Sequence, residues 1–246
     1  MRLAFIFSSL IGTHDSASYF LNMQSKIYNI NPIVSDVLQT FGHLNHLVYN
    51  WSKAQSRNIS EQIHIGARYL DLRLIQVDNI WYTCHGLLGN KFEYIVNDIL
   101  SSGSSIQPIL EITTYTPPNQ ELCRELSRLN YTTTPIYMTG AFCNNTLDDT
   151  LIYNTFAATP HIEEMIEYNK YQVKHYRPRD NQLFKLSWTL TPNVITMIHS
   201  VYKQPKTLLE LAAIANSRWF EFVDWMYAHN YTWPDVIIFD SPINFL

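Results

Sequence analysis

The chain has 246 residues, of which 46% are hydrophobic and 15% charged, and its formal net charge is −4. This composition is typical of a folded globular protein and excludes a disordered chain. The 17 Lys and Arg residues are scattered and form no basic stripe, which argues against nucleic acid as a partner. No apolar run approaches the roughly 20 residues needed to span a bilayer, so we expect no transmembrane anchor.

Segments rich in β-branched and aromatic residues alternate with segments of helical periodicity. This alternation favours a parallel sheet with helical crossovers. The predicted strands are 2–7, 67–75, the segments IWYTCHG, PILEITTY and LFKLSWTLTP, and 235–240. The segment IWYTCHG follows 67–75 closely enough to be either its hairpin partner or the next strand. The predicted helices are 52–65, 92–100, the segment PPNQELCRELSRL and 207–229.

The length of the chain fits one barrel-sized domain, and it contains no internal repeat and no linker-like stretch. We therefore interpret 1–246 as one domain. The fold class predicted is α/β, with a single TIM-like (β/α) barrel that is irregular or incomplete. The composition of residues 131–180 is mixed, so no strands can be assigned there from the sequence.

The three cysteines, Cys84, Cys123 and Cys143, form neither an even set nor a CxxC pair. This pattern favours a reducing compartment, so we expect a cytoplasmic protein. Five N-x-S/T sequons leave secretion open without supporting it.

Titratable residues follow three predicted strands at the point where each strand ends. His14 and Asp15 come after the first strand, His85 after WYTC, and Asp240 after VIIF. Functional groups of barrels and parallel sheets collect at the carboxyl ends of the strands, so these side chains are candidates for one site. Only seven glycines occur, yet Gly12 lies beside His14 and Gly86 beside His85, where a tight turn or a close ligand would require glycine.

Asp71 and Arg73 lie two residues apart on a predicted strand and therefore face the same side. A carboxylate and a guanidinium inside a barrel are costly unless they are paired or used. The planar guanidinium suits phosphate, and two nearby histidines would supply a base and an acid for phosphodiester cleavage. If the barrel closes, Asp240 could reach His14 and fix its tautomer. Taken singly, each residue has a plainer structural explanation as an ion pair, a turn cap or a satisfied histidine.

Five segments of the chain form a recognisable set: GTHDSASY, NWSKAQSRNISEQIHIGARYLDLRL, WYTCHG, LSWTLTP and VIIFDSP. The set resembles the X domain of phosphatidylinositol-specific phospholipase C, especially the metal-independent bacterial enzymes and the X-domain-only proteins. The likeness is strong over 3–100, returns over 184–242 and is faint between them. It implies cleavage of phosphatidylinositol or a related phospholipid at a membrane surface, giving diacylglycerol and a cyclic inositol phosphate.

The resemblance also implies a role for each residue of the candidate site. His14 would take the proton from the inositol 2-hydroxyl, with Asp240 as its orienting partner. Arg73 would stabilise charge on the phosphate oxygens, and His85 would protonate the departing diacylglycerol oxygen. Asp15 would assist on the side of Arg73 and the leaving group.

The position of Arg73 also bears on cofactors. Calcium-dependent members of the family carry a carboxylate there, so the arginine predicts a site with no metal and no cofactor. Bacterial members have an inositol-contacting lysine near the position of Thr113, and this chain has none there. The remaining candidates for substrate binding are Asp71, Glu111, Tyr115, Trp188, Lys174 and Arg177. The basic residues among them would equally suit a solvated face.

Two other functions stay open. The chain could be a catalytically weak or silent barrel that binds lipid head groups, or a glycerophosphodiesterase-like enzyme that depends on a divalent metal. A binder would not need an acid and a base together, so His14 and His85 favour the enzyme.

Overall fold

The computed structural model describes residues 9–28, 44–103, 107–129, 134–176, 181–200, 203 and 205–241. The strand predicted at 2–7 and the candidate residue Arg177 lie outside these ranges. Within them, ten strands form one sheet, and eight of these strands are neighbours in the order β7-β6-β5-β2-β1-β10-β9-β8.

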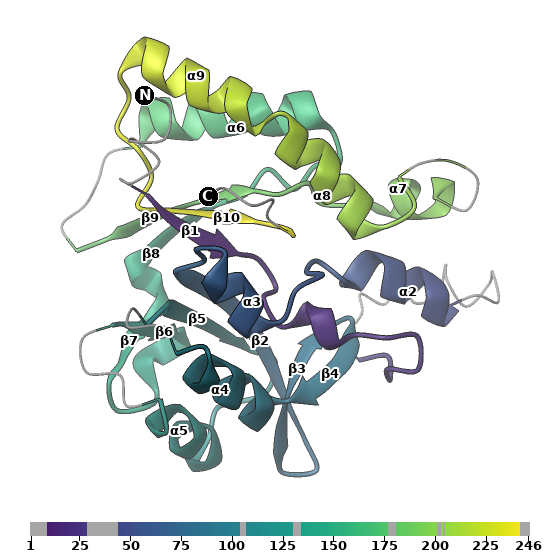
Figure 1. Cartoon of the computed structure of the whole chain (residues 1–246), viewed down its shortest axis with the longest axis vertical. Helices are drawn as coiled ribbons and strands as arrows, with labels where there is room; N and C mark the ends of the chain where they lie inside the picture. The colour runs from purple at the N-terminus through teal and green to yellow at the C-terminus, as the bar shows by residue number, and fades with distance from the viewer. Residues whose placement is uncertain are drawn as a thin grey trace.

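All seven ladders along this path are parallel. The strands are β1 (Leu10–Thr13), β2 (Tyr69–Val77), β5 (Ile109–Thr114), β6 (Ile136–Met138), β7 (Thr146–Asp148), β8 (Ile152–Thr155), β9 (Leu183–Trp188) and β10 (Val236–Phe239). In the described part of the chain, β7 and β8 share no ladder. The parallel strands therefore curl into an incomplete barrel (Figure 1), which confirms the predicted fold class.

Two further strands extend the sheet from β2. β3 (Ile80–His85) pairs with β2 in antiparallel register, and β4 (Leu87–Lys91) pairs with β3. The segment IWYTCHG is thus the hairpin partner of β2, one of the two arrangements expected from the sequence. Gly86 has a φ of 68° and makes the turn between β3 and β4, a conformation that glycine adopts without steric cost.

Helices cover the outer faces of the sheet. They are α2 (Leu44–Ser52), α3 (Ile59–His64), α4 (Phe92–Ser101), α5 (Gln120–Ser127), α6 (Ile162–His175), α7 (Val194–His199), α8 (Leu208–Ser217) and α9 (Trp219–His229). Short 3-10 turns lie at Ser18–Phe20, Thr139–Ala141 and Asp149–Leu151. Figure 1 shows α6, α8 and α9 on the side of β9 and β10, and α4 and α5 on the opposite side.

Two predicted helices are broken in the structure. The helix expected at 52–65 is replaced by α2 and α3, because Asn58 starts α3 with a capping box in which its side chain accepts from the Glu61 amide. The helix expected at 207–229 is divided into α8 and α9 at Arg218, whose φ of −101° and ψ of 1° leave the helical range. The segment left without strands in the sequence analysis contains β6, β7, β8 and α6.

The lower part of the barrel interior is apolar. Tyr69, Tyr137, Ile152, Val236 and Ile238 form one buried cluster there. Period-two alternation on each strand then brings polar side chains inward above this cluster, such as Asp71 two residues after Tyr69. The barrel thus has an apolar floor and a polar upper layer at the carboxyl ends of its strands.

Gly12 is required by the packing of this floor. A Cβ atom at Gly12 would lie 2.7 Å from Ile238 Cγ2 and 3.0 Å from Tyr69 Cβ. The close approach at Gly12 is therefore made by the barrel interior. The expectation of a tight turn or a close ligand at this glycine is wrong.

The cysteines form a pair that the sequence analysis did not find. Cys123 and Cys143 are joined in a disulfide, and Cys84 is free and buried. Disulfides persist in oxidising environments, so the cysteine content no longer supports a reducing compartment.

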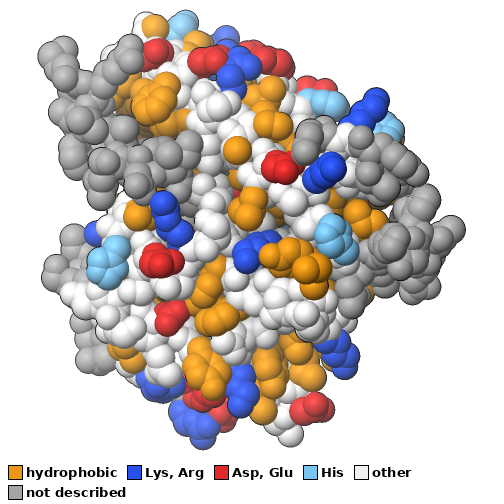
Figure 2. Space-filling model, turned by 45° about the vertical axis from the view of Figure 1, so that its right-hand side comes forward, with side chains coloured by type: hydrophobic (Ala, Val, Ile, Leu, Met, Phe, Trp, Pro, Cys, Tyr) orange, Lys and Arg blue, Asp and Glu red, His pale blue; other side chains and the backbone are white. Residues whose placement is uncertain are grey.

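On the face in Figure 2, acidic, basic and hydrophobic side chains are interspersed among the described residues, without a continuous basic stripe. None of the described helices combines the length and hydrophobicity needed to cross a bilayer.

Candidate active site

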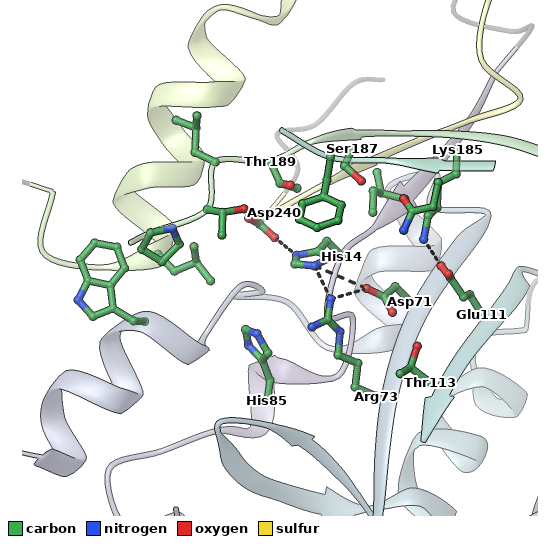
Figure 3. A pocket seen from close by; sticks show the side chains of 18 of the residues that line it. His14, Asp71, Arg73, His85, Glu111, Thr113, Lys185, Ser187, Thr189 and Asp240 are labelled. Atoms are coloured by element: carbon green, nitrogen blue, oxygen red, sulfur yellow. Dashed lines mark hydrogen bonds and ion pairs between the residues drawn. The ribbon is translucent and has the colours of Figure 1, made fainter. Parts of the chain in front are cut away.

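His14 and Asp240 come together because the first described strand pairs with the last. β1 and β10 run parallel from Leu10 opposite Val236 to Thr13 opposite Phe239. The next residue on each strand enters the site, and His14 Nδ1 lies 2.8 Å from Asp240 Oδ1 in a hydrogen bond (Figure 3).

Buried amide side chains hold the backbone on both sides of this pair. Gln55 Nε2 donates to the carbonyl oxygens of His14 at 2.8 Å and Phe239 at 3.1 Å. Asn216 Nδ2 donates to the carbonyl oxygen of Asp240 at 3.1 Å. Because these bonds fix the two chain segments, the imidazole and its carboxylate are pre-positioned.

Arg73 lies on β2 between three polar partners. Its Nη2 is 2.7 Å from His14 Nε2 and 3.5 Å from Asp71 Oδ2, and its Nε is 2.6 Å from Asp15 Oδ1. Burial works to lower the pKa of Arg73, but the carboxylates of Asp15 and Asp71 outweigh this effect and raise it. The guanidinium is therefore a fixed positive charge in the site.

His85 ends β3 and lies near His14 (Figure 3). Its Nδ1 lies 2.7 Å from the Ser52 carbonyl oxygen, and its Nε2 lies 3.0 Å from Asp15 Oδ2. Asp15 reaches both His85 and Arg73 from a left-handed turn with a φ of 44°, which Asp tolerates better than most residues. The ring centroids of His14 and His85 are 6.3 Å apart, with an interplanar angle of 77°.

The hydrogen-bond partners of the two rings place a proton on Nδ1 in each. A guanidinium only donates, so His14 Nε2 accepts from Arg73 and the ring proton is on Nδ1, toward Asp240. His85 Nδ1 donates to the Ser52 carbonyl oxygen, and its Nε2 lies 3.0 Å from a carboxylate oxygen of Asp15. The arrangement thus presents two imidazoles, each with Nε2 directed toward the shared charges of Arg73 and Asp15.

The surrounding charges stabilise His14 once it has taken up a proton. Burial lowers the pKa of His14, but the carboxylates of Asp15 and Asp240 outweigh burial and raise it to about 9. Burial alone would raise the pKa of Asp71, but Arg73 and His14 lower it to about 2. Burial raises the pKa of Asp240, against the effect of His14. The Arg73 donor at Nε2 fits the neutral ring of His14, whereas the carboxylates of Asp15 and Asp240 favour the protonated ring.

These groups line a cavity of about 390 Å³ at the carboxyl ends of the strands. The histidines and Arg73 form one side of it. The other side carries polar side chains from β5, β8 and β9, namely Glu111, Thr113, Asn154, Lys185 and Ser187.

Lys185 is the charged cavity residue that the sequence analysis missed. It is buried on β9 and forms an ion pair with Glu111, which also accepts a 2.7 Å hydrogen bond from the Tyr69 hydroxyl. A signal was present in the sequence, because Lys185, Ser187 and Thr189 alternate along an otherwise apolar strand and so share its inner face.

Three predicted substrate contacts do not line the cavity. Trp188 points to the outer face of β9, where its indole donates to the Ala215 carbonyl oxygen at 2.9 Å within the helix-facing core. Lys174 lies in the last turn of α6, which leads back to the amino end of β9, far from the site. The expected substrate contacts of Trp188 and Lys174 are therefore wrong. Tyr115 lies beside Arg73, to which its hydroxyl is hydrogen-bonded.

One group of side chains offers ligand atoms for a metal ion, and a guanidinium lies among them. His14, Asp15 and Asp71 offer ligand atoms within 4.8 Å of one another in the described part of the chain. The Arg73 guanidinium already contacts all three at 2.7, 2.6 and 3.5 Å. A cation bound by the same atoms would lie against this positive charge.

Comparison with known proteins gives partial sequence matches and a match over almost the whole fold. No family model matches the sequence. Over 91 residues the chain is 31% identical to a PI-PLC X-box domain-containing protein of Dictyostelium discoideum, covering 37% of this chain and 11% of that protein. Over 82 residues it is 34% identical to PI-PLC X domain-containing protein 1 of Danio rerio, covering 31% and 26%. The matches thus span a small part of these relatives' length.

The structural match is broader. The phosphatidylinositol-specific phospholipase C from Listeria monocytogenes superimposes with a TM-score of 0.63 at 15% identity, covering 96% of this chain and 89% of that one. At this identity the likeness concerns the fold. Together with the sequence matches it confirms the resemblance to the X domain and the incomplete barrel.

Proposed function

We propose that this chain, which resembles the X domain of phosphatidylinositol-specific phospholipase C, is a phosphodiesterase that cleaves phosphatidylinositol or a related phospholipid. The observation that carries the proposal is the placement of two histidines, with ring centroids 6.3 Å apart, beside one half-buried guanidinium. A head-group binder would need the guanidinium but not an acid and a base together.

In the proposed reaction, His14 Nε2 takes the proton from the head-group hydroxyl next to the phosphate. The hydroxyl oxygen bonds to phosphorus as the bond between phosphorus and the diacylglycerol oxygen breaks. His85 gives its Nε2 proton to that leaving oxygen, so the products are diacylglycerol and a cyclic inositol phosphate. Opening of the ring by water would use the same two residues with exchanged roles.

Arg73 and Asp240 support these steps electrostatically. When the phosphate enters, Arg73 exchanges its contact with His14 for the non-bridging oxygens, whose charge its N–H groups match. This exchange frees His14 Nε2 to act. Asp240 then stabilises the imidazolium that forms, as an orienting carboxylate does in other histidine-based sites.

The reaction proposed here needs no calcium. Arg73 supplies the positive charge that a cation would otherwise provide, and it contacts the carboxylates that would bind one. A glycerophosphodiesterase mechanism, which requires a metal held by carboxylates, fits this guanidinium poorly.

The substrate lipid would be met at a membrane surface. Phe156 lines the cavity and is 53% exposed, and α7, which carries the 63% exposed Ile195, lines it through Met197. Apolar side chains at the mouth of a polar cavity suit contact with acyl chains.

Turnover of a soluble chromogenic inositol phosphodiester tests the proposal. We expect release of the chromophore by the wild type in excess EDTA, and a loss of at least about 100-fold in His14→Ala and in His85→Ala. The exposed His229 on α9 provides the control His229→Ala, which should retain the wild-type rate. Equal slow release by all four proteins would favour the silent head-group binder, and abolition by EDTA would favour a metal-dependent enzyme.

A further inference from the structure

The cavity contains a second charged group on the side opposite His85. Lys185 on β9 and Glu111 on β5 form an ion pair across the barrel, with side chains 3% and 12% exposed. The Tyr69 hydroxyl from β2 donates to the same Glu111 oxygen, and Lys185 Nζ lies 5.7 Å from the centre of the Tyr69 ring. In Figure 3, Lys185 and Glu111 lie beyond Asp71 as seen from His85. The proposed proton transfers use none of these three residues.

Lys185 and Glu111 have hydrogen-bond donors and an acceptor that their contacts among the described residues do not use. An ammonium has three N–H donors, and among the described residues Lys185 Nζ makes one ion pair, to Glu111 Oε2. The same Oε2 takes the Tyr69 bond, which leaves Oε1 as a further acceptor. Buried polar groups are almost always satisfied, so a cavity with spare donors and an acceptor is suited to a polar ligand.

The charges of the group define the kind of ligand. Lys185 and Glu111 neutralise each other, so the pair offers no net charge to attract a second phosphate or an ammonium. Vicinal hydroxyls, each both a donor and an acceptor, match an ammonium beside a carboxylate. The neutral side chains of Thr113, Asn154 and Ser187 line the same part of the cavity. The phosphate of a phosphorylated ring would be repelled there by the carboxylate of Glu111.

We propose that Lys185, positioned by Glu111 and Tyr69, is the residue by which this site recognises the ring hydroxyls of an uncharged polyol head group. The inference rests on the proposed function in one respect. The proposed function places the phosphate at Arg73, and the ring therefore lies toward β5 and β9. Lys185 then determines specificity without taking part in the chemistry.

Two chromogenic phosphodiesters separate ring recognition from chemistry. One carries inositol, and the other carries cis-2-hydroxycyclohexanol, which keeps the attacking hydroxyl and lacks the other ring hydroxyls. In the wild type, kcat/KM should favour the inositol ester. In Lys185→Met we expect the ratio of the two kcat/KM values to fall about 10- to 100-fold, mostly through KM, since charge-assisted hydrogen bonds are lost.

The matched control is Lys170→Met on α6, which removes an ammonium from a surface ion pair with Glu167. It should keep the wild-type ratio. Thermal unfolding of each variant verifies that the barrel is folded. A wild-type ratio in folded Lys185→Met overturns the inference while leaving the proposed function intact.

A second variant gives a readout that a purely structural role would not produce. Glu111→Gln removes the neutralising charge and keeps the size, so Lys185 gains a free positive charge. Calorimetric titration should then show tighter binding of myo-inositol 4-phosphate relative to myo-inositol than the wild type shows. An unchanged preference in this variant contradicts the assignment, even where Lys185→Met does not fold.

The two proposals fail in different ways. If the wild type cleaves neither ester, the proposed function is wrong, and the titration with free myo-inositol still tests the inference. Binding by the wild type that is lost in Lys185→Met supports the inference for a silent binder. No binding of myo-inositol by the wild type, with or without turnover, overturns it.

Discussion

Asp240 holds the imidazole of His14 at 2.8 Å, although 226 positions separate them in the sequence. The contact exists because β1 and β10 are neighbours in parallel register, so that the residues after Thr13 and Phe239 emerge side by side. Closure of the barrel at this seam is thus what assembles the candidate base from the two ends of the described chain.

The first prediction concerns this contact. In Asp240→Asn the carboxylate that favours His14 protonation is lost, and the amide no longer requires the Nδ1–H tautomer. We expect kcat/KM to fall at least about 100-fold, and the acid limb of the pH–rate profile to move to lower pH. The pH–rate profile distinguishes a loss of the carboxylate's role from a loss of stability, because a variant that only loses stability would keep the acid limb of the wild type. An unshifted limb in a folded protein contradicts the role given to Asp240.

The second prediction concerns stability and pH. The pKa of His14 is raised from 6.5 to about 9, so protonated His14 is favoured in the folded state. Its stabilising contribution is complete below pH 6.5 and is lost as pH rises through about 9. We expect the free energy of unfolding to fall over this window by on the order of 1–3 kcal/mol.

Urea unfolding at the two ends of the window measures the change, with His14→Gln as the comparison. The glutamine cannot titrate, so the pH dependence should be smaller in that variant. If the free energy of unfolding changes equally with pH in the wild type and the variant, the titration belongs to other groups.

The sequence was informative where one physical rule applied locally. Strand ends in a parallel sheet share one rim, so the titratable residues directly after three predicted strands could be grouped into one candidate site by sequence alone. Alternation along β2 likewise placed Asp71 and Arg73 on one face, and both lie in the cavity.

The same rule, applied to β9, separates Lys185 from Trp188 but does not choose between them. Residues 185, 187 and 189 share one face of that strand and residue 188 lies on the other, but the sequence does not say which face is inside. That choice depends on the helices packed outside, where Trp188 contacts Trp219 and Phe222.

Other features depend on contacts that local patterns do not contain. β6 and β7 have three residues each, too few for a period-two signal. The disulfide joins α5 to a turn after β6, and its two cysteines are 20 positions apart without a recognisable spacing. The lysine that the family comparison sought near Thr113 is absent there, and the structure instead places Lys185 at Glu111 from a strand farther along the chain.

The third prediction concerns Arg73. Its guanidinium contacts His14, Asp15 and Asp71 in three directions, which a lysine ammonium on a flexible stem does not reproduce. We expect Arg73→Lys to lower kcat/KM by about 10²- to 10³-fold, mainly through kcat, since the charge of the transition state is less well matched. Steady-state kinetics with the soluble inositol ester measures the effect. An unchanged kcat/KM would remove Arg73 from the proposed mechanism.

The last prediction concerns the barrel floor beneath the site. In Gly12→Ala the added Cβ would lie 2.7 Å from Ile238 Cγ2 and 3.0 Å from Tyr69 Cβ. Relief requires β1 to shift against β2 or β10, and overpacking of this kind costs about 1–3 kcal/mol. Because His14 follows two residues later, its 2.8 Å contact with Asp240 should loosen and activity should fall with stability. A double-mutant cycle with Ile238→Ala, followed by urea unfolding, tests the cause. If the clash is with Ile238, the double variant should be destabilised by less than the sum of the single variants, whereas strict additivity would exclude that contact.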